Sequence, residues 1–220
     1  APLVPLCDAR FFNNYHACLN IGGIANISFE TASGRIGFDI CGANQLLNYI
    51  AGTVGLEYDE NGELAAEGQV DTSLLEELNN CSYFNLLFPK SLDNHFVRKY
   101  FIDRIAASRI PVNDKLATAV EHIAQQIAAV ILKQQNNQIP YRLLVTGGGA
   151  FNSYLISRIE QAAQIKIQLP TIQLIQYKEA LAMCLMGVER LKNKANFLPS
   201  VTGAKTAVCG GDIATPNTEK

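Results

Sequence analysis

The sequence predicts a mixed α/β sheet, and two patterns lead to that prediction. Three short runs with strand-like alternation follow one another at residues 18–21, 24–29 and 35–40, and Gly22-Gly23 forms a turn between the first two. Connections this short favour an antiparallel meander. Farther along, strands alternate with helices, which favours parallel pairing and right-handed crossovers. Three antiparallel strands followed by such units have the strand order of the ribonuclease-H-like fold.

The segment after the meander is expected to be helical. A helix is predicted from Asn44 to about Gly52, with its apolar residues on one face. From about residue 54 to 111, two helical stretches over 72–78 and 96–105 are separated by polar loops. This region has no continuous apolar run of its own, so we interpret it as a small helical insertion and not as a separate domain.

The final third alternates between helices and strands, as βα units require. The expected elements are a helix capped by Asn113 or Asp114, a strand over 143–146, a helix capped by Asn152 or Ser153, a strand over 165–169 and a helix from Glu179 to about Lys192.

Composition excludes several classes of protein. The 220 residues are 48% hydrophobic and 17% charged with a formal net charge of −2, values typical of a globular protein. The balanced charge gives no reason to expect a nucleic-acid partner, and no apolar run has the ~18–20 residues that a membrane span needs. The six cysteines form no C-x-x-C pair and are expected to be reduced and buried, as in a cytoplasmic protein. The three histidines form no metal-binding pattern, so no metal site is expected.

Gly147-Gly148-Gly149-Ala150 follows a predicted strand and precedes a predicted helix. Glycine at such a turn permits positive φ and close approach of a ligand, and the helix N-terminus offers free N–H groups. The segment is either a nucleotide-contacting loop or a tight turn without a ligand. It matches neither G-x-G-x-x-G nor the Walker pattern.

The turn at Gly22-Gly23 also has two interpretations. It is either a simple hairpin turn or a phosphate-facing turn, with Asn20 and Asn26 nearby as neutral hydrogen-bonding groups.

Several charged positions are candidates for chemistry, each with a structural alternative. Asp39 ends a predicted strand, where it either caps the next helix or acts as a base in a cleft. Glu179 opens the last predicted helix, where the helix dipole alone favours a carboxylate. Asp59 and Glu60 lie in a polar turn and are expected to be solvated. Lys90 follows a proline and either holds a phosphate or lies in a solvated loop.

Taken together, these segments resemble the C-terminal part of the anhydro-N-acetylmuramic acid kinases, a family of the actin/hexokinase-like ATPase superfamily. The matching stretches follow the family's order over nearly the whole chain: residues 1–5 (APLVP), 19–26 (LNIGGIAN), 37–39 (GFD), Tyr58-Asp59 with Gly62 and Ala65, 89–91 (PKS), 144–150 (LVTGGGA) with Asn152, 179–182 (EALA) and 198–204 (LPSVTGA).

The resemblance implies an actin-like ATPase lobe of a cytoplasmic kinase that acts in cell-wall recycling. Such an enzyme uses ATP and Mg²⁺ to phosphorylate 1,6-anhydro-N-acetylmuramate while water opens the anhydro ring, and it releases N-acetylmuramate 6-phosphate. The implied partners are this amino-sugar substrate, an N-terminal lobe and, as an open question, a second copy in a homodimer. The implied roles are a general base at Asp39, substrate contacts at Asn44 and Glu179, nucleotide contacts at Gly147, Gly148, Gly149, Ala150 and Asn152, and a phosphate-side hairpin with Asn20, Gly22, Gly23 and Asn26.

The chain departs from the family's pattern in three places. After Asp39 the family has Thr-Gly-Pro-Gly-Asn, whereas Ile40-Cys41-Gly42-Ala43-Asn44 follows here. After Lys90-Ser91 the family often has Thr-Gly-Arg-Glu, whereas Leu92-Asp93-Asn94-His95 follows here. The family's Gly-Thr-Ser-x-Asp-Gly phosphate loop does not occur in the 220 residues. Residues 1–220 are therefore expected to form the C-terminal lobe and to be inactive alone.

Two other functions stay open. The chain could be a non-catalytic ribonuclease-H-like module that docks a partner, which exposed apolar surface mated to another protein would favour. It could also be a different kinase or acyl-transfer ATPase with the same fold. Asp39 followed by Asn44, together with the segment 201–204 (VTGA), argues against that second alternative.

Overall fold

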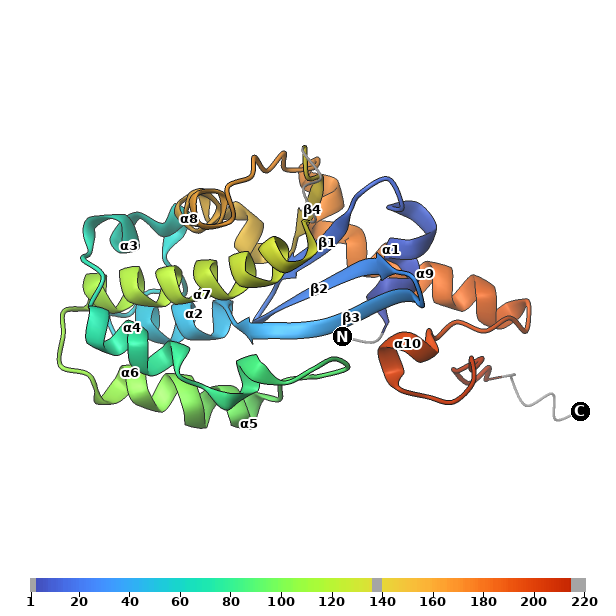
Figure 1. Ribbon diagram of the computed structural model, residues 1–220, viewed down its shortest axis with the longest axis horizontal. Coiled ribbons are helices and arrows are strands. Elements are labelled where there is room, and N and C mark those ends of the chain that lie inside the picture. The colour runs from blue at the N-terminus through green and yellow to red at the C-terminus, as the bar shows by residue number, and fades with distance from the viewer. Residues whose placement is uncertain (1–2, 136–139, 215–220) are drawn as a thin grey trace, which may run out of the picture.

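In the computed structural model, which describes residues 3–135 and 140–214, the centre of the protein is a four-stranded sheet (Figure 1). The strands are β1 (Ala17–Ile21), β2 (Ile24–Thr31), β3 (Gly34–Gly42) and β4 (Leu143–Thr146), in the order β3-β2-β1-β4. β2 pairs antiparallel with both β1 and β3, and β4 pairs parallel with β1. The predicted meander and the predicted mixed sheet are confirmed. Ala1, Pro2 and residues 215–220 lie outside the described part of the chain.

Helices make up most of the remaining described residues. They are α1 (Val4–Phe11), α2 (Asn44–Gly52), α3 (Glu63–Glu67), α4 (Thr72–Asn79), α5 (Asn94–Val97), α6 (Asp103–Ala107), α7 (Val112–Gln134), α8 (Ser153–Ala163), α9 (Ile172–Leu191) and α10 (Pro199–Thr202). A π-helical segment, Arg98–Ile102, joins α5 to α6, and 3₁₀ turns cover Glu60–Gly62, Ser82–Asn85 and Gly148–Phe151.

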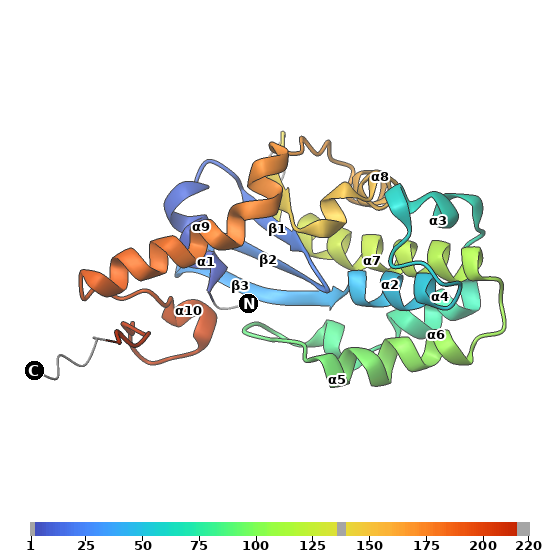
Figure 2. The same ribbon diagram turned by 180° about the vertical axis from the view of Figure 1, so that it is seen from behind.

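Alternation along the strands gives the sheet two different faces. Leu19 and Ile27 point into the main core, which they share with Val120 of α7. Cys18 points to the opposite face and packs in a second cluster with Ala182 of α9. Figure 1 shows α7 in front of the sheet, and Figure 2 shows α9 crossing the other face.

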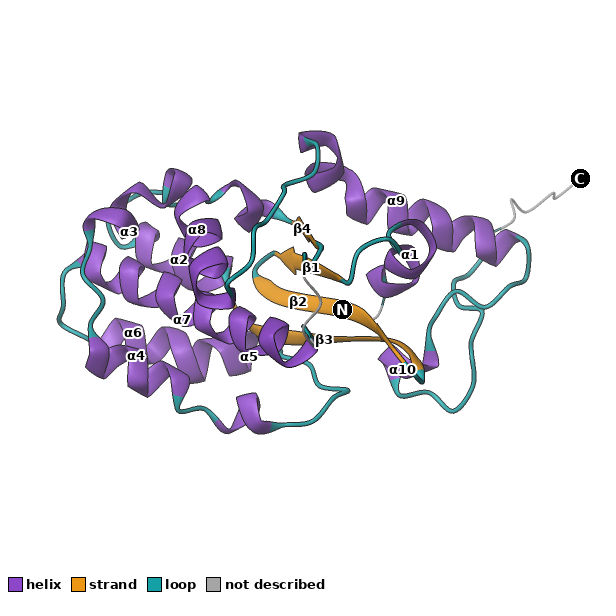
Figure 3. Cartoon of the chain, turned by 45° about the horizontal axis from the view of Figure 1, so that its top comes forward, coloured by secondary structure: helices purple, strands orange, loops and turns teal. Residues whose placement is uncertain are grey.

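The predicted insertion at residues 54–111 is mainly helical, as expected, and lies beside α2 and α7. Leu78, Phe101 and Ile105 belong to the same core cluster as the inner face of the sheet. In Figure 3 these helices gather at one end of the molecule, whereas α1, α9 and α10 lie at the other. The insertion is therefore built onto the core of the sheet.

The predicted strand at residues 165–169 is wrong, because this segment has no strand structure. Its apolar alternation is satisfied by packing, since Ile165 is buried and Ile167 packs against the main core. Its backbone N–H groups are used by α8: Ile165 donates to the carbonyl of Glu160 (3.2 Å), and Ile167 donates to Glu160 Oε1 (2.7 Å). The N–H groups that this segment would offer to a neighbouring strand are therefore bonded to Glu160 of α8 instead.

Three predicted helix starts need correction. The last helix begins at Ile172, where Thr171 accepts a hydrogen bond from Leu174 N, so Glu179 lies two turns inside α9. The helix dipole therefore does not explain Glu179. The long helix begins at Val112 without a side-chain cap, and Asp114 instead accepts from Gln69 N (2.8 Å).

The third correction concerns Asp39, which does not end its strand. β3 continues to Gly42, and the residue that precedes α2 is Ala43, which makes no side-chain cap. The interpretation of Asp39 as a helix cap is wrong. The helix α1 was not predicted from the sequence.

A buried network of charged groups joins α1, the sheet and α9. Lys178 Nζ lies 2.8 Å from Asp8 Oδ1, and Ser28 Oγ donates to Asp8 Oδ2 (2.5 Å). Arg35 Nε donates to Ser28 Oγ (3.1 Å), and all four residues are buried. Removing one partner of a buried ion pair typically costs ~3–5 kcal/mol. The network therefore fixes the position of α9, and with it the position of Glu179.

Cysteine burial was predicted in part. Cys7, Cys18, Cys41 and Cys81 are buried free thiols, whereas Cys184 and Cys209 are exposed. Within the described residues, every helix is too short or too polar to traverse a lipid bilayer.

Candidate functional site

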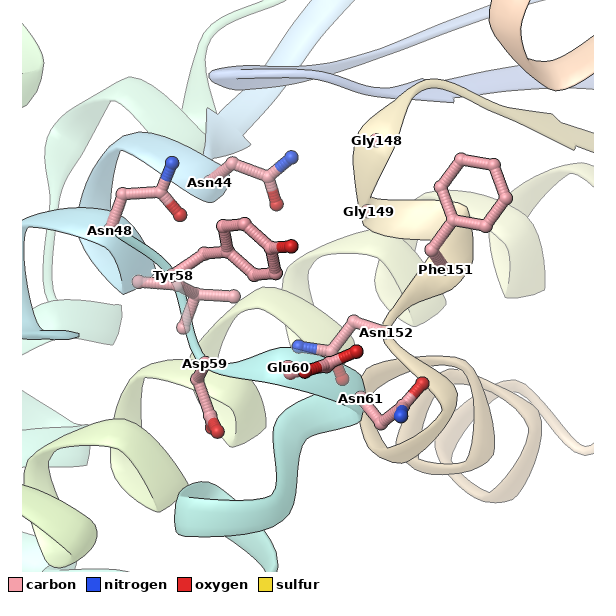
Figure 4. A pocket seen from close by; sticks show the side chains of 11 residues that line it. Asn44, Asn48, Tyr58, Asp59, Glu60, Asn61, Gly148, Gly149, Phe151 and Asn152 are labelled. Carbon is pink, nitrogen blue, oxygen red and sulfur yellow. The ribbon is translucent and has the colours of Figure 1, made fainter. Parts of the chain in front are cut away.

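A pocket of about 520 Å³ lies between α2, the turn after β4 and the segment before α3 (Figure 4). Asn44 and Asn48 of α2 form one wall, and Gly148 and Gly149 form the opposite wall. The ring of Tyr58, which is 55% exposed, lies between these walls. The size of the pocket, together with its aromatic and amide groups, suits a nucleoside-sized ligand.

The three glycines after β4 differ in what they can tolerate. Gly147 has a φ of 85°, and a Cβ there would lie 2.7 Å from the carbonyl oxygen of Ile21. A Cβ on Gly149 would lie 2.2 Å from Ile21 Cγ2. The nearest atom to a Cβ on Gly148 is Asn44 Nδ2 at 3.4 Å, an ordinary contact. Gly147 and Gly149 are therefore required by the fold, and Gly148 faces the pocket.

The residues after these glycines have separate places. Asn152 lines the pocket, and its Oδ1 accepts from Leu155 N (2.9 Å), so it is the predicted cap of α8. Ala150 is 1% exposed and lies in the core, and it lines neither this pocket nor the next one.

A second pocket of about 290 Å³ adjoins the first, because Gly148 and Phe151 line both. Its other lining residues include Asn20, Gly22, Gly147, Lys178 and Glu179. The predicted nucleotide segment and the predicted phosphate-side hairpin therefore meet here. Glu179 lies at the same pocket, whereas Asn44, expected at the substrate, lies in the larger one.

Four polar residues form a row across the sheet, each directly paired with the next. Thr146 pairs with Asn20, Asn20 with Asn26, and Asn26 with Asp39. Directly paired residues point to the same face, and neighbouring strands are ~4.8 Å apart, so Asp39 lies roughly 10 Å from Asn20. The topology therefore joins three candidates, Asn20, Asn26 and Asp39, into one polar surface beside the smaller pocket, to which Asn20 belongs.

Asp39 is a buried carboxylate, with 6% of its surface exposed. Its Oδ2 accepts a hydrogen bond from Leu92 N (2.9 Å). Burial raises the pKa of Asp39 above its ordinary value of 3.8, and the Leu92 hydrogen bond opposes that rise. A carboxylate with a raised pKa is a stronger base near neutral pH.

The Gly22-Gly23 turn supports the start of α2. The carbonyl of Gly22 accepts from Asn44 N (3.0 Å), and the carbonyl of Gly23 accepts from Ala43 N (2.8 Å). Gly22 also lines the smaller pocket, whereas Gly23 lines neither pocket. The turn joins β1 and β2 in a hairpin and places Gly22 beside the smaller pocket, and its phosphate-facing role stays a prediction.

The structure corrects two expectations of solvated side chains. Asp59 is buried and accepts from Leu64 N (2.9 Å) and Ala65 N (3.0 Å), so it holds the start of α3. Lys90 Nζ donates to the carbonyl of Tyr83 (3.2 Å) and lies 4.5 Å from the centroid of the Tyr83 ring. Burial lowers the pKa of Lys90. The Lys90 ammonium group therefore contacts both the carbonyl and the ring of Tyr83.

Several lining residues were not identified from the sequence. Asn48, Phe151 and Lys178 stand singly, in no pattern that distinguishes them from helix or turn residues. Tyr58 was noted only because Tyr58-Asp59 forms part of the resemblance.

The sheet, the helices on both of its faces and the glycine turn at the end of β4 define a lobe of the actin-like ATPase fold. A solved structure supports this assignment: the activator of the 2-hydroxyisocaproyl-CoA dehydratase from Clostridium difficile, with bound ADPNP, matches with a TM-score of 0.52 and 15% sequence identity. The match covers 86% of this chain and 65% of the activator chain. The predicted fold class is confirmed.

Comparison with known sequences gives the particular family. The model of the family described as anhydro-N-acetylmuramic acid kinase matches residues 1–216. The chain is 38% identical to such a kinase from Haemophilus influenzae and 35% identical to one from Pasteurella multocida, with 97% of this chain covered in each case. The chain belongs to the anhydro-N-acetylmuramic acid kinase family. It spans 61% and 59% of the length of these two relatives.

Proposed function

We propose that these residues form the C-terminal lobe of an ATP-dependent kinase of 1,6-anhydro-N-acetylmuramate. The enzyme would hydrolyse the anhydro bond, phosphorylate O6 and release N-acetylmuramate 6-phosphate. The observation that carries the proposal is the junction of the two pockets at Gly148, with the polar row from Asn20 to Asp39 beside it. We place the enzyme in the cytoplasm, where ATP is the phosphoryl donor.

In this proposal the larger pocket takes the nucleoside and the smaller one takes the phosphates. Tyr58 offers an aromatic face to the base, and the amides of Asn44 and Asn48 offer hydrogen bonds. Gly148 lets the phosphates approach the backbone at the junction. An N-terminal lobe would close the opposite side of the phosphates, because phosphoryl transfer depends on positioning and charge stabilisation from all sides.

The donor groups here fit a Mg²⁺ ion that is held mainly by phosphates. Mg²⁺ keeps several waters and often needs only one or two protein oxygens. The Asn20 amide oxygen lines the smaller pocket and is the candidate protein ligand. When bound, the ion neutralises charge on the phosphate oxygens.

Asp39 is the proposed base. The anhydro bond joins C1 to O6, so water attacks C1 as the C1–O6 bond breaks, and O6 takes the γ-phosphoryl group of ATP, which leaves as ADP. The Asp39 carboxylate takes the proton of that water as the new C1–O bond forms. Leu92 N holds one carboxylate oxygen, and within the described residues no hydrogen bond is made to the other. Glu179, fixed on α9, is the proposed contact to the sugar.

The test uses the full-length natural polypeptide that contains these residues. It is incubated with ATP, Mg²⁺ and 1,6-anhydro-N-acetylmuramate in ¹⁸O-water, and the product is analysed by mass spectrometry. We expect a sugar 6-phosphate with the label at C1 and no label in the phosphoryl group. ATP-dependent product that lacks the C1 label would refute the hydrolytic step. Absence of turnover, with the protein folded, would favour the alternative of a partner-docking module.

A further inference from the structure

The peptide group that follows Asp39 lies at an irregularity in the sheet. Ala25 pairs with Cys41, and Asn26 pairs with Asp39, so Ile40 is an extra residue in β3. Such a bulge removes a residue from the regular pattern of ladder hydrogen bonds and bends the strand. The carbonyl of Asp39 belongs to the same peptide group as the N–H of Ile40. This carbonyl accepts a hydrogen bond from the hydroxyl of Tyr83 (2.6 Å).

The insertion segment from Tyr83 to Leu92 also holds Asp39 at two further atoms. The backbone N–H of Asp39 donates to the carbonyl of Lys90 (3.3 Å), and Leu92 N donates to Asp39 Oδ2 (2.9 Å). Both peptide groups of Asp39 and one carboxylate oxygen are therefore fixed by a segment more than forty positions away, since Tyr83 is 44 residues from Asp39 along the chain.

Tyr83 is itself held rigidly. It is 3% exposed, and its ring packs against Phe84 and Phe96, with centroid separations of 6.0 and 5.7 Å. Lys90 Nζ lies over the same ring. Burial raises the pKa of Tyr83, so its hydroxyl stays protonated and remains a donor.

We propose that Tyr83 is a positioning residue for Asp39. Its hydroxyl fixes the Asp39–Ile40 peptide at the bulge, so that the carboxylate keeps one orientation towards the attacking water. This inference rests on the proposed function, in which Asp39 is the base. A displacement of about 1 Å at a reacting group can cost on the order of 10²-fold in rate. Loss of the hydrogen bond to the Asp39 backbone is therefore expected to lower the reaction rate.

The first test is Tyr83→Phe in the full-length natural polypeptide, because phenylalanine keeps the ring and removes only the hydroxyl. We expect kcat to fall by about ten- to a hundredfold, with KM for the sugar nearly unchanged. The matched control is Tyr141→Phe. Tyr141 is also buried, and its hydroxyl has no hydrogen-bond partner among the described residues. This control should keep the wild-type kcat.

The second test asks whether Tyr83 acts through Asp39. If it does, Tyr83→Phe should have little further effect on kcat in the Asp39→Asn background, because effects on one catalytic unit are not additive. Equal fold-losses in both backgrounds would overturn the proposal. So would a folded Tyr83→Phe enzyme with wild-type kcat. An unfolded Tyr83→Phe protein would also overturn it, because the hydroxyl would then serve stability.

A third test needs no kinase activity, so it distinguishes failure of this inference from failure of the proposed function. Backbone hydrogen exchange is followed at Leu92, whose N–H donates to the Asp39 carboxylate. Tyr83→Phe should speed exchange at Leu92 on the order of tenfold while the core amides of α7 stay protected. Unchanged exchange at Leu92 counts against positioning. An inactive wild-type enzyme would refute the proposed function without changing the expected hydrogen exchange at Leu92.

Discussion

Asp39→Asn is the substitution that tests the proposed chemistry most directly. Asparagine has nearly the shape of aspartate, and its amide oxygen can still accept the hydrogen bond from Leu92 N, which is 2.9 Å long in the structure. The Tyr83 hydroxyl contacts the backbone carbonyl, so this contact also survives. The substitution therefore removes the proton acceptor and leaves the local contacts in place.

The expected loss of rate is large. A general base contributes ~10²–10⁴-fold, which corresponds to about 3–5 kcal/mol of transition-state stabilisation. We expect kcat to fall by this factor.

The expected change in stability has the opposite sign. Burial raises the pKa of Asp39, so the folded protein binds more protons than the unfolded chain between 3.8 and the raised value. Asp39 therefore lowers stability as the pH rises through that window. At neutral pH the Asp39→Asn enzyme should have a Tm equal to or above that of wild type.

The assay measures kcat and Tm on the same full-length preparations, with Asp93→Ala as the control. Asp93 accepts from Phe96 N (2.7 Å) and caps α5, so it is an aspartate of the same region with a capping role. The control should keep its kcat and lose up to about 1 kcal/mol of stability. In wild type, kcat/KM should also fall as the pH drops below the raised pKa of Asp39.

Two results would refute the assignment of Asp39. One is an Asp39→Asn enzyme whose kcat lies within a few-fold of wild type. The other is a loss of Tm as large as that of a helix cap, with kcat preserved, because that pattern is structural.

Three further predictions concern other parts of the chain. The 220 residues expressed alone should show no ATP-dependent turnover and should gain it when the family's N-terminal lobe is supplied; turnover by the 220 residues alone would contradict this. Gly148→Val should weaken nucleotide binding in calorimetry while the protein stays folded, whereas Gly149→Val should unfold it, because a Cβ at Gly149 would lie 2.2 Å from Ile21 Cγ2. Equal nucleotide affinity in a folded Gly148→Val protein would make that turn purely structural. Burial lowers the pKa of His122 from 6.5 to about 3, so the unfolded chain binds the extra proton and stability should fall as the pH drops from 6.5 towards 3. The slope is up to about 1.4 kcal/mol per pH unit, and His122→Gln should remove it in denaturant titrations at several pH values.

The sequence predicted the sheet because its patterns are local. Alternation in the three meander strands, short turns and a glycine run after a buried strand each depend on neighbouring residues. The errors arose where distant contacts override such patterns. Residues 165–169 alternate like a strand, but the N–H of Ile167 donates a hydrogen bond to the carboxylate of Glu160 (2.7 Å) and not to a neighbouring strand.

The candidate site could be predicted only in part for the same reason. Asp39 and Asn20 stood near the predicted ends of strands and Gly148 in a glycine turn, where chemistry is expected. Tyr83 and Lys178 gave no comparable signal. The role of Tyr83 depends on a contact 44 residues away, and Lys178 is neutralised by Asp8 from the other end of the chain.

The polar row across the sheet links folding accuracy to chemistry. In β1 the side chains of Asn20 and Leu19 point to opposite faces, so a register slip by one residue would exchange a site group for a core group. A chain that pairs its strands wrongly would lose its core and its reaction surface in the same event. Substitutions on this surface therefore act on a sheet in which one strand register places both the core residues and the site residues.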